Sequence, residues 1–152
     1  MFIANYIGLL HGSETHLKDS LLKVAEHHKS EPDIEYICQM LAGWSDMHIQ
    51  HLEHFIKRYE EAKESEPDKL QKTLFHGIRK GALGLLRDLH DLYLLATEVE
   101  ISYMVITQAS QALRDDELEK FCKDAIKETE RQINWLKTRL KQSAPQVLVA
   151  AG

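Results

Sequence analysis

Residues 2 to 29 read FIANYIGLLHGSETHLKDSLLKVAEHHK, and their spacing decides the fold class. Apolar side chains recur every three or four residues, which places them on one face of an α-helix. The face holds Ile3, Ile7, Leu10, Glu14, Leu17, Leu21, Val24 and His28. The stretch therefore predicts one long amphipathic helix, and it places an acid, Glu14, in the middle of the apolar stripe.

Three further segments have the same spacing, and none alternates with the period of two that marks a strand. They run from the Ser30–Asp33 start signal to about Ala62, from about Ala82 to Leu113, and from about Asp116 to Gln142. The first two and the last two helices are joined by a few residues only, so each pair is predicted to form an antiparallel hairpin. The 19 residues from Lys63 to Gly81 are long enough to return along the bundle. The sequence thus predicts an all-α four-helix bundle with a long crossover between helices 2 and 3.

Composition supports one ordered domain, because the chain has 152 residues with 43% hydrophobic and 28% charged side chains. The formal net charge is −5, so the chain has no excess of basic side chains to neutralise phosphates, and no nucleic-acid role is predicted. The apolar start is interrupted at His11 and lacks a basic flank, so we expect a cytoplasmic chain without a membrane segment.

We predict a bundle over residues 1–142 and an uncharged tail, SAPQVLVAAG, over residues 143–152. Cys38 and Cys122 match no metal or redox spacing and are predicted to be buried free thiols.

Three acids fall on the predicted inner stripes: Glu14, Glu100 and Glu128. Hard divalent metals prefer carboxylate oxygens, and dinuclear bundles take one Glu from each of two helices and Glu-x-x-His from each of the other two. Arg131 stands where the fourth helix would supply histidine, and His51 is preceded three residues earlier by His48 rather than by Glu. A complete dinuclear site cannot be assembled from these residues.

Several short strings nevertheless resemble bacterial stress-induced ferritin-like proteins. They are Ser13-Glu14-Thr15-His16-Leu17 through Ala25-Glu26, His51-Leu52-Glu53-His54-Phe55, and Glu98-Val99-Glu100-Ile101-Ser102-Tyr103. The resemblance covers most of the chain and implies the ferritin-like fold. It also implies a dinuclear metal site, to which Glu14, Glu100 and Glu128 would contribute by position.

The inward acids have three interpretations. They could lie at the edges of their stripes and reach solvent, or form a metal-free cluster neutralised by Arg131 with His48 or His51, or bind metal. His48 and His51 could likewise be hydrogen-bonded edge residues, or they could hold a single zinc or iron ion with a carboxylate from another helix.

Two functional hypotheses follow. The first is a di-iron or di-manganese protein that reduces dioxygen or peroxide or stores metal. Its ligands would be Glu14, His51, Glu100 and Glu128, with His48 as a possible substitute. Zinc is less expected than iron or manganese. The second, which the residue chemistry favours, is a metal-free relative that needs no cofactor and acts as a stress-related binding or assembly module through its outer faces or its C-terminal tail. A homodimer and a protein partner at the tail are both compatible with the sequence, and no catalytic residue is assigned.

Overall fold

The computed structural model describes residues 1–62 and 77–150. In these ranges the chain forms four α-helices and no strand: α1 (Ile3–His27), α2 (Pro32–Arg58), α3 (Gly81–Leu113) and α4 (Asp116–Pro145). A short 3-10 helix, η1 (Glu60–Ala62), follows α2, and a π-helical segment, η2 (Gln146–Ala150), continues from α4. The predicted all-α bundle is confirmed.

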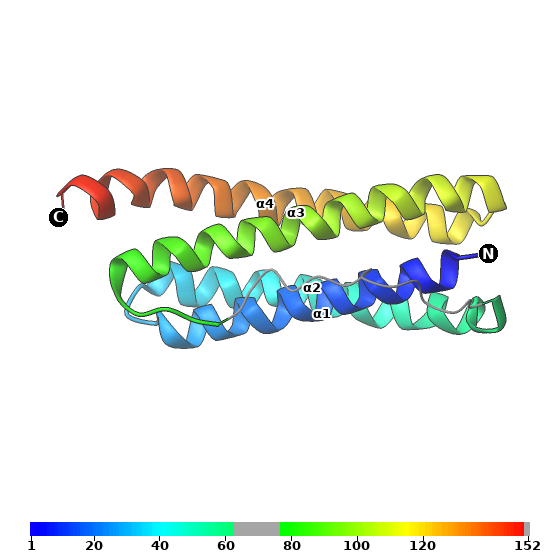
Figure 1. Cartoon of the computed structure of the whole chain (residues 1–152), viewed down its shortest axis with the longest axis horizontal. Helices are drawn as coiled ribbons and strands as arrows, with labels where there is room; N and C mark the ends of the chain where they lie inside the picture. Colours follow the sequence, from blue (N-terminus) through cyan, green and yellow to red (C-terminus); the bar gives the residue numbers. More distant parts are fainter. Residues whose placement is uncertain (63–76, 151–152) are drawn as a thin grey trace.

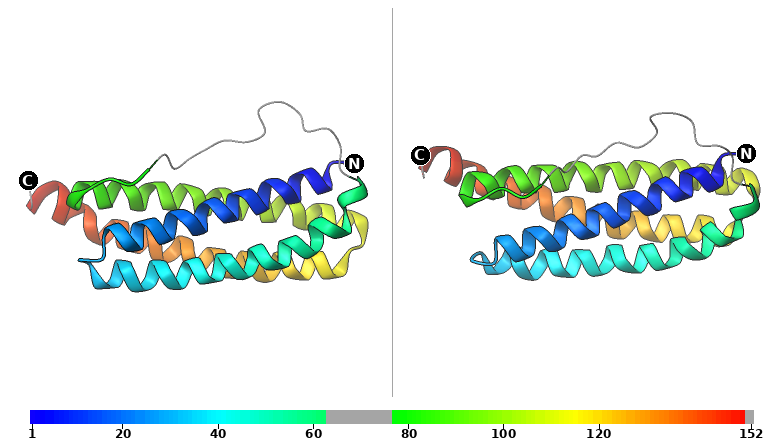
Figure 2. Two further views of the ribbon diagram at one scale, coloured as in Figure 1. Left: turned by 90° about the horizontal axis from the view of Figure 1, so that it is seen from below. Right: turned by 60° about the horizontal axis from the view of Figure 1, so that its bottom comes forward.

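The helices lie side by side along one long axis as two hairpins, α1 with α2 and α3 with α4 (Figure 1). α1 packs mainly on α2 and α3, whereas the contact between α2 and α4 is much smaller than that between α1 and α3 (Figure 2). The end of α2 and the start of α3 lie at opposite ends of the bundle. Most of the predicted crossover falls on residues 63–76, which are outside the described part of the chain.

The core follows the amphipathic stripes of the helices. The predicted inner stripe of α1 is buried, including Glu14 in its middle. In α3 the buried face includes Leu92, Leu95 and Val99, whereas Glu100, which was predicted on the inner stripe, is only half-buried. Cys38 and Cys122 are buried free thiols, as predicted, and burial raises the pKa of each to about 12.

Asp115 fixes the turn between α3 and α4. α3 ends at Arg114, whose φ of 55° is left-handed, and the Asp115 carboxylate then caps α4 by accepting a hydrogen bond from Leu118 N at 3.1 Å. The same carboxylate accepts from Arg58 Nη1 at 2.7 Å and from Tyr59 Oη at 2.6 Å, so it also ties the turn to the end of α2. Burial raises the pKa of Asp115, but these hydrogen bonds outweigh it and leave the pKa below its ordinary value.

Replacing Asp115 with alanine removes the helix cap and the link to α2 together. We expect Asp115→Ala to lower the free energy of unfolding by about 2 kcal/mol, measured by urea denaturation. Asp116→Ala is the matched control, because Asp116 is exposed and lies one residue away. The control should change stability by less than about 0.5 kcal/mol, and equal effects at the two positions would contradict the assignment of the cap.

The predicted tail is helical where it is described. α4 continues past Gln142 to Pro145, and η2 contacts both α4 and α3. Among the described residues, no helix has the length and apolar character needed to cross a membrane.

Candidate functional site

Three polar side chains from three helices meet inside the bundle. Glu14 Oε2 accepts a hydrogen bond from His48 Nδ1 at 2.6 Å and another from Tyr103 Oη at 2.7 Å. Glu14 and Tyr103 are fully buried, and His48 is 3% exposed. We call Glu14, His48 and Tyr103 the central triad.

The triad follows from the helical stripes that carry it. Glu14 lies between Leu10 and Leu17 on the α1 stripe, so the fold of α1 cannot turn its carboxylate to solvent without exposing the leucines. An isolated buried carboxylate is strongly unfavourable, which requires donors from the facing helices. His48 of α2 and Tyr103 of α3 supply them, and their rings also meet edge to face with centroids 5.9 Å apart.

A second buried polar contact joins α2 to α4. Gln132 Nε2 donates to Ser45 Oγ and to the carbonyl oxygen of Leu41, each at 2.9 Å. Ser45 and His48 form an inward i, i+3 pair on α2, and the buried Thr129 and Gln132 form another on α4. A dinuclear carboxylate centre has Glu-x-x-His on two of its helices, whereas α2 and α4 present Ser-x-x-His and Thr-x-x-Gln on their buried faces.

Three buried polar atoms of this region make no hydrogen bond within the described part of the chain: Glu14 Oε1, His48 Nε2 and Gln132 Oε1. His48 Nε2 lies 3.7 Å from Glu128 Oε1, and the side chain of Glu128 is 43% exposed. The imidazole therefore lies between two carboxylates, with Glu14 at Nδ1 and Glu128 near Nε2. A proton on each ring nitrogen turns both contacts into attractive ones.

The surroundings shift the pKa values of His48 and Tyr103. Burial alone lowers the pKa of His48, but the hydrogen bond to Glu14 and the charges of Glu14 and Glu128 outweigh it, so the pKa lies above its ordinary value. Burial raises the pKa of Tyr103 well above its ordinary range, and the charge of Glu14 adds to this. Tyr103 therefore acts as a neutral hydrogen-bond donor at Glu14, and the two carboxylates favour the protonated form of His48.

The raised pKa of His48 predicts a pH dependence of stability. A histidine whose folded pKa exceeds its unfolded value of about 6.5 gives its full stabilisation below that pH and loses it as the pH rises through the folded pKa. We expect the free energy of unfolding to fall as the pH is raised above about 6.5. Urea denaturation of the wild type and of His48→Gln at a series of pH values checks this, because the variant should lack this part of the dependence. Parallel pH curves would contradict it.

Two of the five predicted ligands lie apart from the central triad. His51 is exposed, donates from Nδ1 to the carbonyl oxygen of Met47 at 2.8 Å, and stacks on Phe121. Glu100 is half-buried, and its pKa is raised by burial and by the charge of Glu130. Arg131 is exposed, and no ion pair among the described residues joins it to the inward acids, so the interpretation in which it neutralises them finds no support. The donors to Glu14 are His48 and Tyr103 instead, and Glu128 approaches only His48.

These positions do not fit a dinuclear metal centre. Such a centre needs several carboxylates directed at one point, but Glu14 Oε2 is already shared by two donors and Glu100 lies beside Glu130. Across residues 1–62 and 77–150, no group of three or more His, Cys, Asp and Glu side chains is placed to hold a metal ion. The carboxylates of Glu14 and Glu128 instead favour a proton on the His48 ring that lies between them.

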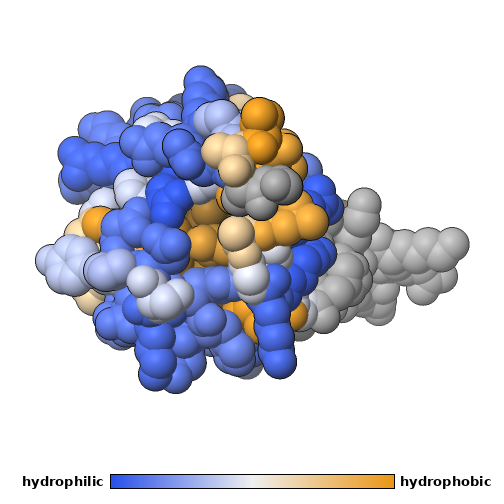
Figure 3. Space-filling view, turned by 90° about the vertical axis from the view of Figure 1, so that its left-hand side faces the viewer, coloured by the Kyte–Doolittle hydropathy of each residue, from blue (hydrophilic) through white to orange (hydrophobic). Residues whose placement is uncertain are grey.

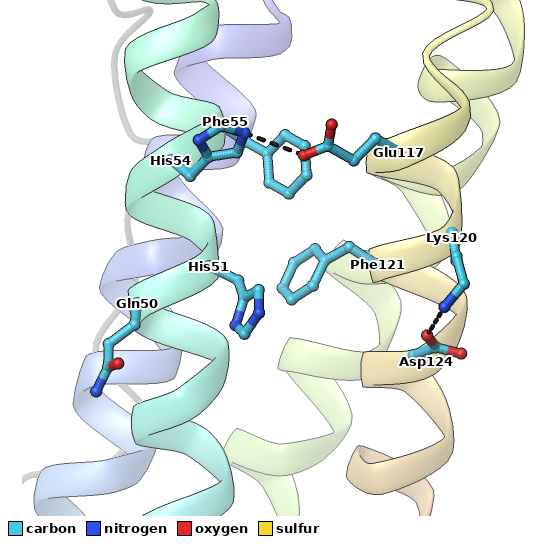
Figure 4. Close-up of a pocket in the computed structure, with 8 residues that line it drawn as sticks. All are labelled: Gln50, His51, His54, Phe55, Glu117, Lys120, Phe121 and Asp124. Carbon is cyan, nitrogen blue, oxygen red and sulfur yellow. Dashed lines mark hydrogen bonds and ion pairs between the residues drawn. The ribbon is translucent and has the colours of Figure 1, made fainter.

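An open pocket of about 490 Å³ lies outside the triad, between α2 and α4 (Figure 4). The rings of His51 and Phe121 face each other across it, with centroids 5.4 Å apart. Phe121 also packs against Tyr103 and His48, so its ring lies between this pocket and the central triad. His54 and Glu117 are hydrogen-bonded at its rim, and Lys120 and Asp124 form an ion pair there.

Sequence reasoning missed a second buried polar cluster near the start of α3. Asp88 is fully buried and accepts hydrogen bonds from His28 Nε2 at 2.9 Å, from Arg79 Nη1 at 2.9 Å and from Arg79 N at 3.0 Å. Arg79 Nη1 also donates to Asp91 at 2.9 Å. The signal in the sequence was the pair of acids three residues apart inside the apolar run of α3. This cluster ties the segment before α3 to the end of α1.

Sequence reasoning did not include Tyr103 among the candidate site residues, although its hydroxyl group completes the triad. The position of Tyr103 on the inner stripe of α3 was a usable signal, since a buried tyrosine hydroxyl needs a hydrogen-bond partner.

Comparison of the chain with known protein families, curated proteins and solved structures finds no match.

Proposed function

We propose that the chain is a metal-free, ferritin-like helical bundle that acts as a binding or assembly module. The observation that carries the proposal is the hydrogen bonding of Glu14, whose Oε2 atom is shared by His48 and Tyr103 in the bundle interior. In this arrangement the polar centre stabilises and aligns three helices, and the outer surface does the binding. The stress-related role rests on the resemblance to bacterial stress-induced ferritin-like proteins.

Apolar side chains on the outside of the bundle support a binding role. α3 is apolar on its outer as well as its inner face, with Leu83, Leu94 and Ile101 between 42% and 58% exposed. A helix that is apolar all round is normally covered on all sides. Exposed apolar side chains along such a helix favour a site for another macromolecule.

The alternative function is an iron or manganese protein with oxidase, peroxidase or storage activity. One observation favours it: His48 Nε2 and Glu128 Oε1 are 3.7 Å apart, while Glu14 holds the other ring nitrogen of His48. A carboxylate on the second nitrogen is the usual support for a metal-bound histidine. These two donors could contribute to a site for a single ion, which differs from the dinuclear site that the resemblance implies.

Elemental analysis separates the two functions. The chain is purified without chelator and analysed by plasma mass spectrometry, before and after anaerobic loading with iron(II) or manganese(II). The proposal predicts far less than one metal ion per chain in both samples. About two ions per chain would establish the dinuclear alternative, and one ion per chain that is lost in His48→Gln would establish the single-ion site.

A further inference from the structure

A self-complementary stripe runs along the outer face of α3. It consists of Leu83, Arg87, His90, Leu94, Glu98 and Ile101, which we call the α3 outer stripe. The six residues fall within about 80° of one another around the helix and extend over about 27 Å. Five of them are exposed, Glu98 is half-buried, and none belongs to the buried core.

The stripe can pair with a second copy of itself that runs in the opposite direction. If a second α3 lies antiparallel on the first, Leu83 lies opposite Ile101 of the second copy, Arg87 opposite Glu98, and His90 opposite Leu94. All three pairs share one midpoint near residue 92, so one two-fold axis generates each pair twice. The two ends of the stripe then make apolar contacts, and the reciprocal Arg87–Glu98 pairs match opposite charges.

A groove at one end of the stripe fits the same arrangement. Its volume is about 480 Å³, and it lies between the first turns of α3 and the end of α4 with η2. The lining comprises Leu83, Leu86, Arg87, His90, Leu140, Lys141, Ala144 and Leu148. Apolar surface is open to the outside at this end of the bundle, between polar side chains (Figure 3).

In the antiparallel register, exposed apolar side chains of the second copy lie opposite the groove. Ile101 and Met104 are about half exposed near the other end of the stripe, and the register brings them to the groove of the second copy. The groove lining includes three basic side chains and no acid, while Glu98 of the second copy arrives beside Arg87. We infer that two copies of this chain associate through the α3 outer stripes, antiparallel and with two-fold symmetry. This inference rests on the proposed assembly function and names its partner.

A charge exchange tests the interface without touching the core. Sedimentation velocity over a range of protein concentrations should show the wild type approaching twice the mass of one chain. Arg87→Glu places like charges together at both reciprocal pairs and should raise the dissociation constant about tenfold. Glu98→Arg should do the same, and the double variant Arg87→Glu/Glu98→Arg should restore the wild-type constant. Lys127→Glu is the matched control, because Lys127 is an exposed cation of α4 outside the stripe.

Cysteine cross-linking tests the antiparallel register. A mixture of Leu83→Cys and Ile101→Cys chains should oxidise to a disulfide-linked pair, whereas either variant alone should remain uncrosslinked. The native thiols of Cys38 and Cys122 are buried and do not compete. Cross-linking of each variant with itself would indicate a parallel pair and overturn the proposed register.

A monomer at all concentrations, or a dimer unaffected by Arg87→Glu, would overturn the inference. Either result combined with no metal uptake removes only the second copy as the partner and leaves the metal-free bundle in place. Metal uptake by a protein that still dimerises would remove the metal-free bundle and leave the second copy as the partner. The two proposals therefore fail separately.

Discussion

Replacing Glu14 with alanine should be the most damaging single change in the bundle. We expect Glu14→Ala to lower the free energy of unfolding by about 4 kcal/mol, because it leaves His48 and Tyr103 buried without their shared acceptor. Urea denaturation followed by circular dichroism measures the loss. A change of less than about 1 kcal/mol would mean that the carboxylate reaches water and that the central triad does not stabilise the fold.

Two controls separate the parts of this effect. Tyr103→Phe removes only one hydrogen bond to the carboxylate and should cost about 2 kcal/mol. Glu14→Gln keeps the shape and an acceptor oxygen but cannot balance the charge of His48, so its effect should fall between those of the other two variants. Because Glu14 and Tyr103 are in direct contact, Glu14→Ala/Tyr103→Phe should destabilise less than the sum of the single variants.

Asp88→Ala should have the second-largest effect, about 3 kcal/mol lost from the free energy of unfolding. The physical reason is that the fully buried Asp88 carboxylate accepts from His28 and from both the backbone and the side chain of Arg79. Without it, the buried ring nitrogen of His28 has lost its acceptor, and the segment before α3 is no longer tied to the end of α1. Thermal and urea denaturation measure the change.

Arg79→Ala is the control for Asp88→Ala. The Arg79 side chain is 40% exposed, and its removal leaves the contact between Asp88 and His28 in place. We expect a loss below about 1 kcal/mol. If Arg79→Ala is as damaging as Asp88→Ala, the buried histidine contact is not the main contribution of this cluster.

The fold was largely predictable because the apolar spacing of each helix is long and regular. The residues that start and stop the helices, such as Pro32 at the beginning of α2 and the turn at Asp115, lie where the sequence placed them. The phase of α3 was harder, because α3 is apolar on its inner and outer faces and therefore gives little contrast between them. That weak contrast led to Glu100 being assigned to the inner stripe.

The site was only partly predictable. Glu14 could be placed because its neighbours at three and four residues are leucines that must be buried. His48 and His51 differ by about 60° around α2, and sequence spacing alone cannot say which of them faces the core. Their roles depend on how α2 packs against α1 and α4, which turns His48 towards Glu14 and leaves His51 at the surface beside Phe121.

The polar clusters depend on contacts between residues far apart in the chain. Tyr103 and Glu14 are 89 residues apart, and Asp88 and His28 are 60 apart. An amphipathic pattern shows that such polar residues are inward, but it does not show which partners they meet. For this reason Arg131 was a reasonable choice of counter-charge in the sequence, although its side chain is exposed in the folded chain.

The protonation of His48 tests the account most directly. Nitrogen-15 NMR of histidine-labelled protein, with the His48 signals assigned from the His48→Gln spectrum, follows both ring nitrogens through a pH titration. We predict that the His48 ring titrates above the ordinary value of about 6.5 and that both of its nitrogens carry protons below that pH. A His48 pKa at or below the ordinary value would contradict a centre in which a protonated imidazole lies between the carboxylates of Glu14 and Glu128.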